Sequence, residues 1–253
     1  VRPPSERWRL DLVPPFLLVL WLVGGVAMGV VQWRRIARHW RLVRKATAPP
    51  SHLTDELRFV AHAMNVRPIP ALVVHGIASP FVWCVGRLRL LWPERLAGEA
   101  DVLRCRGMIA HELAHVWRRD HWVAWLELMA SVVWWWNPLF WFVRRRLHET
   151  AEIACDAVAL SVLPDRRREY AEAFLELSSI GKAWAPAPVL GMSTGARRTF
   201  ERRFAMMLSE RVRSKMSPWG FLAVGLLAIV TLPSWSLGQA PSPSNPGSAP
   251  ASS

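Results

Sequence analysis

The sequence predicts a membrane protein that is mainly α-helical and has a small β-sheet, with one domain between two transmembrane helices. Three observations predict this class. Residues 12–33 contain no charged side chain, and about 20 apolar residues are enough to cross a bilayer as a helix. Residues 216–237 form a second uncharged, apolar stretch. Between these stretches, segments with helical spacing of apolar residues alternate with short segments rich in β-branched and aromatic residues.

The charge of the chain is strongly positive, with 32 Lys+Arg against 19 Asp+Glu. Many basic residues gather after the first apolar stretch and before the second. The positive-inside rule accounts for them and orients residues 34–215 towards the cytoplasm. The charge therefore gives no reason to expect direct binding to nucleic acid. The three cysteines include no C-x-x-C pair, so we expect reduced thiols rather than a disulfide framework.

The predicted organisation has five parts. An N-terminal flank, residues 1–11, precedes a transmembrane helix at residues 12–33, and a cytoplasmic domain occupies residues 34–215. A second transmembrane helix occupies residues 216–237. The Pro/Ser-rich tail, residues 238–253, has no means of building a core, so we expect it to be disordered. The first residue is valine rather than methionine, so we expect a fragment or a processed form.

The elements of the domain follow from local patterns. Residues 51–65 begin at a serine and place apolar side chains at helical spacing, which predicts a helix. Residues 70–76 and 79–92 are rich in β-branched and aromatic residues and predict short strands. Residues 98–121, GEADVLRCRGMIAHELAHVWRRDH, predict one long helix. Further helices, each with a heavily charged face, are expected at residues 166–180 and 197–213.

Residues 122–143 are rich in tryptophan and carry a single charge, Glu127. One transmembrane crossing here would place the two flanks on opposite sides of the membrane. A metal site shared by both flanks requires them on the same side. We therefore expect an apolar helix pair that lies against the membrane and turns near Asn137-Pro138, since tryptophan favours the membrane interface.

The sequence IAHELAHVWRRDH, residues 109–121, contains the pattern H-E-x-x-H. On a helix, residues four apart share a face, so His111 and His115 can direct their imidazoles at one ion. In this pattern the histidines bind zinc, and Glu112 takes a proton from the water that the metal acidifies. The alternative is an ordinary helix with two polar histidines. The composition gives this chance occurrence a probability on the order of 1%.

A hydrolytic zinc site needs a third protein ligand, and residues 147–160 supply two candidates. Glu152 begins the pattern E-x-x-x-D, which places Asp156 one turn along the same face. Asp156 can then accept a hydrogen bond from a ligating histidine and fix its tautomer. We expect Glu152 as the ligand and Asp156 behind it, with Glu149 as the alternative. Cys155 lies three residues after Glu152, and at about 100° per residue its direction on the helix differs by about 300°. We therefore expect it to pack rather than to bind the metal.

The segments HELAHVWRRD and RRLHETAEIACDAVA, with a Trp-rich NPLFW stretch between them, resemble the BlaR/MecR-type membrane metallopeptidases. SPFVWCVGRLRLLWP is similar to the edge strand over the active site of that family, and DRRREYAEAFLEL and RRTFERRFAMML resemble its later helices. The resemblance covers roughly residues 50–215. It implies a gluzincin-like zinc endopeptidase, with Zn²⁺ held by His111, His115 and Glu152, and with Glu112 as the catalytic base.

The resemblance also implies a role in signal transduction. In that family a signal sensed outside activates cleavage of the protease itself or of a cytoplasmic transcriptional repressor. We therefore expect a multi-pass protein of the inner (cytoplasmic) membrane, with its catalytic domain in the cytoplasm. Its partners would be the lipid bilayer and a protein or peptide substrate, which adds as a strand to segments 70–76 and 79–87. The tail is too short for a sensor domain, so β-lactam sensing is not expected.

Two other functions fit parts of the sequence. One is a housekeeping H-E-x-x-H membrane protease, and the other is a non-catalytic signalling scaffold that keeps the fold. The donor for the developing oxyanion is left open. Tyr170 is expected to pack with its hydroxyl at the surface, and His148 to be a solvated helix residue. The sequence does not predict the oligomeric state.

Overall fold

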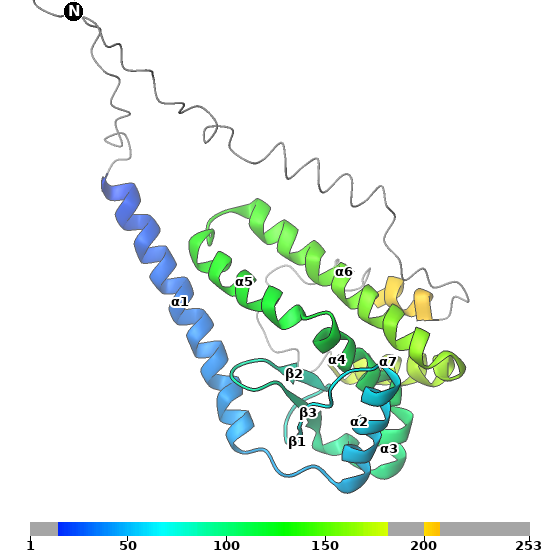
Figure 1. The fold of residues 1–253 in the computed structure, drawn as a ribbon. Helices are drawn as coiled ribbons and strands as arrows, with labels where there is room; N and C mark the ends of the chain where they lie inside the picture. Colours follow the sequence, from blue (N-terminus) through cyan, green and yellow to red (C-terminus); the bar gives the residue numbers. More distant parts are fainter. Residues whose placement is uncertain (1–14, 182–199, 208–253) are drawn as a thin grey trace, which may run out of the picture. The chain divides into compact units, whose positions relative to one another are not determined.

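A long apolar helix, α1 (Pro15–Arg44), precedes the rest of the fold (Figure 1). The structure is a computed structural model that describes residues 15–181 and 200–207. Among these residues, α1 is the one helix long and apolar enough to cross a membrane, which agrees with the first predicted span. The flank 1–11, the second predicted span 216–237 and the tail 238–253 lie outside the described residues.

The small sheet that the sequence predicts is present and is mixed, with the predicted segment 79–92 forming two of its strands. It consists of β1 (Ala71–Val74), β2 (Phe81–Trp83) and β3 (Arg89–Pro93), in the order β1-β3-β2. β3 is central, parallel to β1 and antiparallel to β2. At the β1 edge, Thr47 and Val73 form an isolated bridge, so the chain just after α1 covers that edge. β2 lies at the opposite edge of the sheet.

The core lies between this sheet and the helices α2 (Ser51–Ala63), α3 (Glu99–Arg104) and α4 (Arg106–Trp117). α4 is buried on most of its surface from Gly107 to Ala114, because α2, α6 (Pro138–Val162) and α7 (Arg167–Gly181) pack around it. Apolar side chains from sheet and helices fill the centre, among them Leu53, Leu57, Val60, Leu90, Trp92, Ile109 and Leu113. This burial fixes the helix that carries the H-E-x-x-H pattern.

The prediction of one long helix over residues 98–121 is wrong. α3 ends at Arg104 and α4 begins at Arg106, with Cys105 between them; α4 then ends at Trp117. At the second break Arg119 has a left-handed backbone, with φ of 61°. The second break has no glycine or proline within two residues, whereas Gly107 lies two residues after the first. The first coincides with tertiary contacts, since Cys105 is buried in the core and Arg106 pairs with Glu56 of α2.

The Trp-rich segment forms two antiparallel helices, α5 (Asp120–Val133) and α6 (Pro138–Val162), as Figure 1 shows. The chain turns just before Pro138, where the sequence predicts a break. The Asn137 side chain accepts hydrogen bonds from the first free N–H groups of α6, and proline is favoured at a first helical position. Many large apolar side chains of the pair are exposed, including Trp122, Leu126, Met129, Trp136, Leu139 and Phe142.

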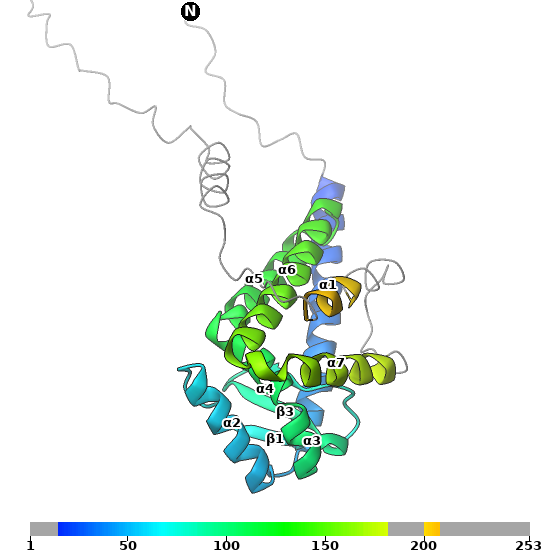
Figure 2. The same cartoon turned by 90° about the vertical axis from the view of Figure 1, so that its right-hand side faces the viewer.

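α1 runs alongside this helix pair in both views (Figures 1 and 2). The Trp21 indole donates to the Val133 carbonyl at 3.0 Å, and the Trp135 indole donates to the Trp21 carbonyl at 3.2 Å. Further along, Gln32 donates to Ser131 at 3.1 Å, and both side chains are buried. Paired polar groups in an apolar contact hold α1 in one register against α5.

The last described elements are α7 (Arg167–Gly181) and a short helical segment at residues 200–207. Both lie beside α4 and the C-terminal half of α6 (Figure 2). The Phe174 ring of α7 stacks on Phe200, and Phe200 stacks on Phe204, with centroids 5.2 and 6.0 Å apart. This aromatic stack docks residues 200–207 against α7. Short 3-10 turns complete the fold at Glu94–Leu96 and Pro164–Arg166.

Candidate metal centre

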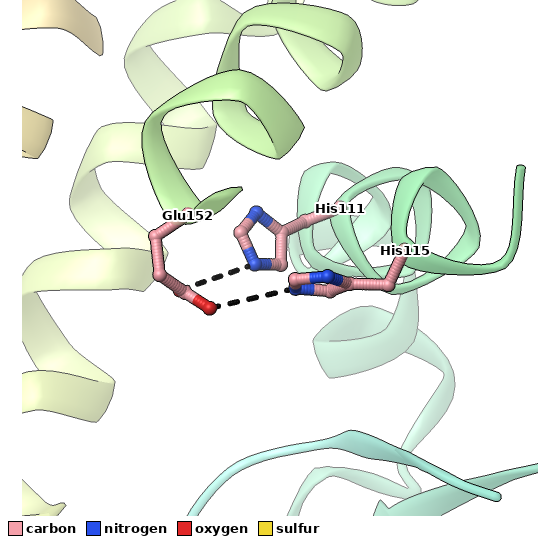
Figure 3. Close-up of side chains that lie close together, drawn as sticks. All are labelled: His111, His115 and Glu152. Carbon is pink, nitrogen blue, oxygen red and sulfur yellow. Dashed lines mark ion pairs between the residues drawn. The ribbon is translucent and has the colours of Figure 1, made fainter. Parts of the chain in front are cut away.

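Two helices bring three candidate ligands together (Figure 3). His111 and His115 project from the same face of α4, and Glu152 faces them from α6. Nε2 of His111 lies 3.6 Å from Glu152 Oε2, and Nε2 of His115 lies 3.5 Å from Glu152 Oε1. All three ligand atoms lie within 4.8 Å of one another. The chain thus gathers the three predicted ligands at one point.

The donor set and its spacing fit a zinc ion. Zinc takes imidazole nitrogen and carboxylate oxygen at about 2.0–2.2 Å, and tetrahedral geometry then separates the ligand atoms by about 3.3 Å. Each histidine Nε2 lies at a similar distance, 3.5 or 3.6 Å, from one of the two oxygens of Glu152. Three protein ligands leave a fourth position for water or substrate, which is the arrangement of a catalytic rather than a structural zinc site.

Glu112 lies between the histidines and the sheet. Its carboxylate is buried and accepts a hydrogen bond from the backbone N–H of Val82 in β2, at 3.1 Å. Burial disfavours the charged carboxylate and raises its pKa, although the nearby His111 and His115 oppose this. A carboxylate beside the candidate ligands and next to the edge of the sheet is suitably located for proton transfer.

Behind His111 lies a buried carboxylate, Asp156. Asp156 Oδ1 lies 2.8 Å from His111 Nδ1, and the Tyr170 hydroxyl donates to the same oxygen at 2.5 Å. The hydroxyl also lies 3.1 Å from His111 Nδ1 and is buried in the site, so the prediction that it would lie at the surface is wrong. Burial would lower the pKa of His111, but the hydrogen bonds to Asp156 and Glu152 raise it to about 10.

A single arginine joins two carboxylates of α6, Glu152 and Asp156. Arg203 donates from Nη1 to Glu152 Oε2 at 2.6 Å, from Nε to Asp156 Oδ2 at 2.7 Å and from Nη2 to Asp156 Oδ1 at 3.0 Å. Burial would raise the pKa of Glu152, but hydrogen bonds from His111 and His115, together with the charge of Arg203, lower it overall. Both carboxylates therefore stay ionised beside the histidines.

A second carboxylate, which is partly buried, lies beside His115. Asp120, at the start of α5, lies with Oδ2 2.9 Å from His115 Nδ1 and 3.2 Å from Arg118 Nε. The Cys155 thiol lies 3.4 Å from the same ring nitrogen and 3.7 Å from Asp120. Burial raises the pKa of this thiol, which keeps it protonated. Cys155 thus lies beside the site, although the sequence predicted a packing role alone.

The chain matches a known protein family over most of its length. A family profile described as BlaR1 peptidase M56 matches residues 8–207, which is most of the chain. The chain belongs to the M56 peptidase family. It is also 30% identical over 106 residues to the protein "Regulatory protein BlaR1" of Bacillus licheniformis. That match covers 41% of this chain and 17% of that relative, so the chain spans only a small part of the relative's length.

Membership of the M56 family confirms the resemblance noted in the sequence and supports a metallopeptidase-type function. In this M56 chain the candidate ligands line a cleft of about 1100 Å³. One wall comes from the β2 edge, at Ala78–Val82 and Cys84, and the other from α5, α6 and α7. Of the two predicted strand edges, the segment at 79–87 reaches this cleft, whereas β1 pairs with β3 and Thr47 at the far edge.

Other predicted residues of the M56 chain lie elsewhere. Glu149, the alternative ligand, accepts hydrogen bonds from Arg145 and Arg146 on the outer side of α6. His148 is not simply solvated: it lines the cleft, and its Nε2 lies 2.7 Å from the buried carboxylate of Glu127.

Sequence reasoning missed two residues that contact the site. The sequence signal for Asp120 was its position five residues after His115. A carboxylate at that position can contact the His115 ring if the helix ends between the two residues. Arg203 carried no signal, because 51 residues separate it from Glu152.

Proposed function

We propose that this chain is a membrane-bound zinc metalloendopeptidase that hydrolyses peptide bonds in signal-triggered regulatory proteolysis. The observation that carries the proposal is the convergence of His111, His115 and Glu152, whose ligand atoms lie within 4.8 Å of one another, a donor set that suits zinc. A carboxylate, Glu112, lies beside them and the edge of a strand lies across the cleft. A scaffold without catalysis would need none of these features.

The roles of the residues follow from their positions. His111, His115 and Glu152 would hold the ion, with Asp156 and Asp120 fixing the tautomers of the two imidazoles. Bound zinc supplies a Lewis acid for the scissile carbonyl and acidifies a water molecule. Glu112 takes the proton of that water at its carboxylate and passes it to the nitrogen of the leaving amine. No other carboxylate among the described residues has a comparable position between ligands and sheet.

The β2 edge provides the surface for an extended peptide. β2 pairs with β3 on one side only, and its other side lines the cleft. The Val82 N–H already points across the cleft, since it donates to Glu112. A substrate segment added as a strand along Ala78–Cys84 would pass directly over the metal ligands. The substrate class is therefore an extended or locally unfolded segment of a protein.

The cellular setting is proposed from membership of the family and from the charge pattern. α1 spans the inner (cytoplasmic) membrane, the α5–α6 pair lies against it through its exposed apolar side chains, and the site faces the cytoplasm. The substrates are the chain itself or a cytoplasmic transcriptional repressor. The word "regulatory" in the name of the Bacillus licheniformis relative favours this role over housekeeping proteolysis.

Replacement of the proposed base tests the activity. Purified protein in detergent would be incubated with zinc, and cleavage of its own chain and of fluorescent casein would be followed by mass spectrometry and fluorescence. Glu112→Gln should lose cleavage and keep zinc, because the amide cannot take a proton. Glu99→Gln, an exposed glutamate at the start of α3, is the matched control and should cleave normally. Normal cleavage by Glu112→Gln would refute the role of Glu112.

A further inference from the structure

Glu152 is held from two sides by different partners. Its Oε1 faces His115 Nε2 at 3.5 Å, which is the side of the proposed ion. Its Oε2 lies 3.6 Å from His111 Nε2 and accepts from Arg203 Nη1 at 2.6 Å, so the arginine contact is much the shorter of the two. A glutamate side chain has three rotatable torsions, and ordering it costs conformational entropy. A charge-assisted bond to one oxygen fixes those torsions and leaves the other oxygen free for a metal.

The same guanidinium also donates two hydrogen bonds to Asp156. Nε and Nη2 reach the two oxygens of Asp156 at 2.7 and 3.0 Å, in the fork geometry that arginine provides and lysine does not. Asp156 is fully buried and contacts Nδ1 of His111. One side chain thus orients a proposed ligand, Glu152, directly and a second ligand, His111, through Asp156.

Electrostatics make this arrangement depend on Arg203. Glu152 and Asp156 lie one turn apart on α6, and Asp156 has no exposed surface. Two neighbouring carboxylates in such a place repel each other, and each is costly to bury unless a positive charge pairs with it. The single positive charge of Arg203 pairs with both carboxylates. Burial alone would lower the pKa of Arg203, but Asp156 and Glu152 raise it overall.

Arg203 is itself held by the short helix on which it lies. Its guanidinium stacks over the Phe174 ring at 4.5 Å, and Phe174 continues the stack to Phe200 and Phe204. Met207, at the end of the segment, is fully buried in the core. The position of the guanidinium therefore depends on the docking of residues 200–207 against α7.

We propose that Arg203 is a positioning residue, which presents Glu152 to the metal as a one-oxygen ligand and makes zinc retention depend on the docking of residues 200–207. This inference rests on the proposed zinc site. Residues 200–207 lie outside the H-E-x-x-H and E-x-x-x-D patterns, yet through Arg203 they contact a proposed metal ligand, Glu152.

Zinc affinity measured by competition with a chelator tests the proposal without any substrate. Arg203→Met should weaken zinc binding about 10–100-fold, the usual effect of removing a partner that orients a metal ligand. Arg202→Met, which removes the exposed neighbouring arginine of the same segment, should bind zinc as the wild type does. The absorption spectrum of the Co²⁺-loaded protein should also change in Arg203→Met alone, because it reports ligand geometry rather than stability.

Arg203→Lys covers the case in which Arg203→Met does not fold. The ammonium keeps the charge but cannot bridge both carboxylates, so its zinc affinity should fall between those of Arg203→Met and the wild type. Combining Arg203→Met with Asp156→Asn should give less than the sum of the single effects, because both act through one network. Wild-type zinc affinity and an unchanged Co²⁺ spectrum in folded Arg203→Met or Arg203→Lys would overturn the inference. Failure of the wild type to bind zinc would instead refute the proposed function.

Discussion

Each proposed histidine ligand has its own carboxylate. His111 Nδ1 faces Asp156 at 2.8 Å, and His115 Nδ1 faces Asp120 at 2.9 Å. A carboxylate at Nδ1 keeps the proton on that nitrogen and leaves the lone pair of Nε2 for a metal. The two rings are therefore prepared in the same tautomer from two different helices, α6 and α5.

The Asp120 contact gives a prediction at this scale. Asp120→Ala removes the acceptor at His115 Nδ1, so the ring can rotate or change tautomer. Zinc affinity should fall about 10–100-fold. Chelator competition measures the change. Asp55→Ala, which removes an exposed carboxylate of α2 paired only with Arg58 among the contacts described, is the control. An Asp120→Ala protein with wild-type affinity would show that His115 needs no such partner.

The sequence could predict some residues of the candidate site and not others, for physical reasons. His111, His115, Glu152 and Asp156 follow from helical spacing within two short segments, so local geometry is enough to group them. Asp120 approaches His115 across the break between α4 and α5, where Arg119 adopts a left-handed backbone. That conformation has no local sequence signal.

At the scale of elements, α4 and α7 approach closely at a glycine. A side-chain carbon on Gly107 would lie 2.6 Å from ring atoms of Tyr170, far inside van der Waals contact. The hydroxyl of the same tyrosine donates to Asp156. The absence of a side chain at Gly107 therefore lets α7 place Tyr170 against the buried network behind His111.

Gly107→Ala should push Tyr170 away from α4. Overpacking of this kind costs about 1–3 kcal/mol, which should lower the thermal unfolding midpoint, and displacement of the hydroxyl should weaken zinc binding. Thermal melting and chelator competition measure the two effects. Gly29→Ala in α1 is the control, because its added carbon meets no atom within 4 Å. Equal melting of both variants would argue against the close approach of α4 and α7.

The elements themselves show the same limit of prediction. The strands and helices were predictable from composition and periodicity, because β-branched runs and helical apolar spacing are local properties. The order β1-β3-β2 was not, since a parallel β1–β3 pair depends on how the chain crosses between them. The break at Cys105 was not predictable either. It coincides with tertiary contacts, the burial of Cys105 and the pairing of Arg106 with Glu56.

At the scale of the whole described chain, α1 and the metal site share one support, the α5–α6 pair. α1 contacts the pair through Trp21, Gly24 and Gln32. The pair in turn carries Asp120 and Glu152 of the site. A change in the position of α1 would therefore act first on the helices that hold these two carboxylates.

Gly24→Leu tests the closeness of this contact. A side-chain carbon at Gly24 would lie 2.1 Å from the Trp135 ring, whereas one at Gly29 meets nothing within 4 Å. Gly24→Leu should separate α1 from the pair and speed proteolysis near Asn137. It should also lower the free energy of unfolding by about 1–3 kcal/mol, which a lower unfolding midpoint would report. Gly29→Leu, the same change in the same helix, should not. Similar proteolysis of the two variants would contradict the packing of α1 on the pair.

The central claim, that His111, His115 and Glu152 form a zinc site, is tested most directly by the zinc content of the purified protein. The measurement compares detergent-purified wild type with Glu152→Ala and Glu149→Ala, using elemental analysis after dialysis. We expect about one zinc per chain in the wild type and in Glu149→Ala, and its loss in Glu152→Ala. A wild type that refuses added zinc, or a Glu152→Ala protein that retains it as tightly, would contradict the account.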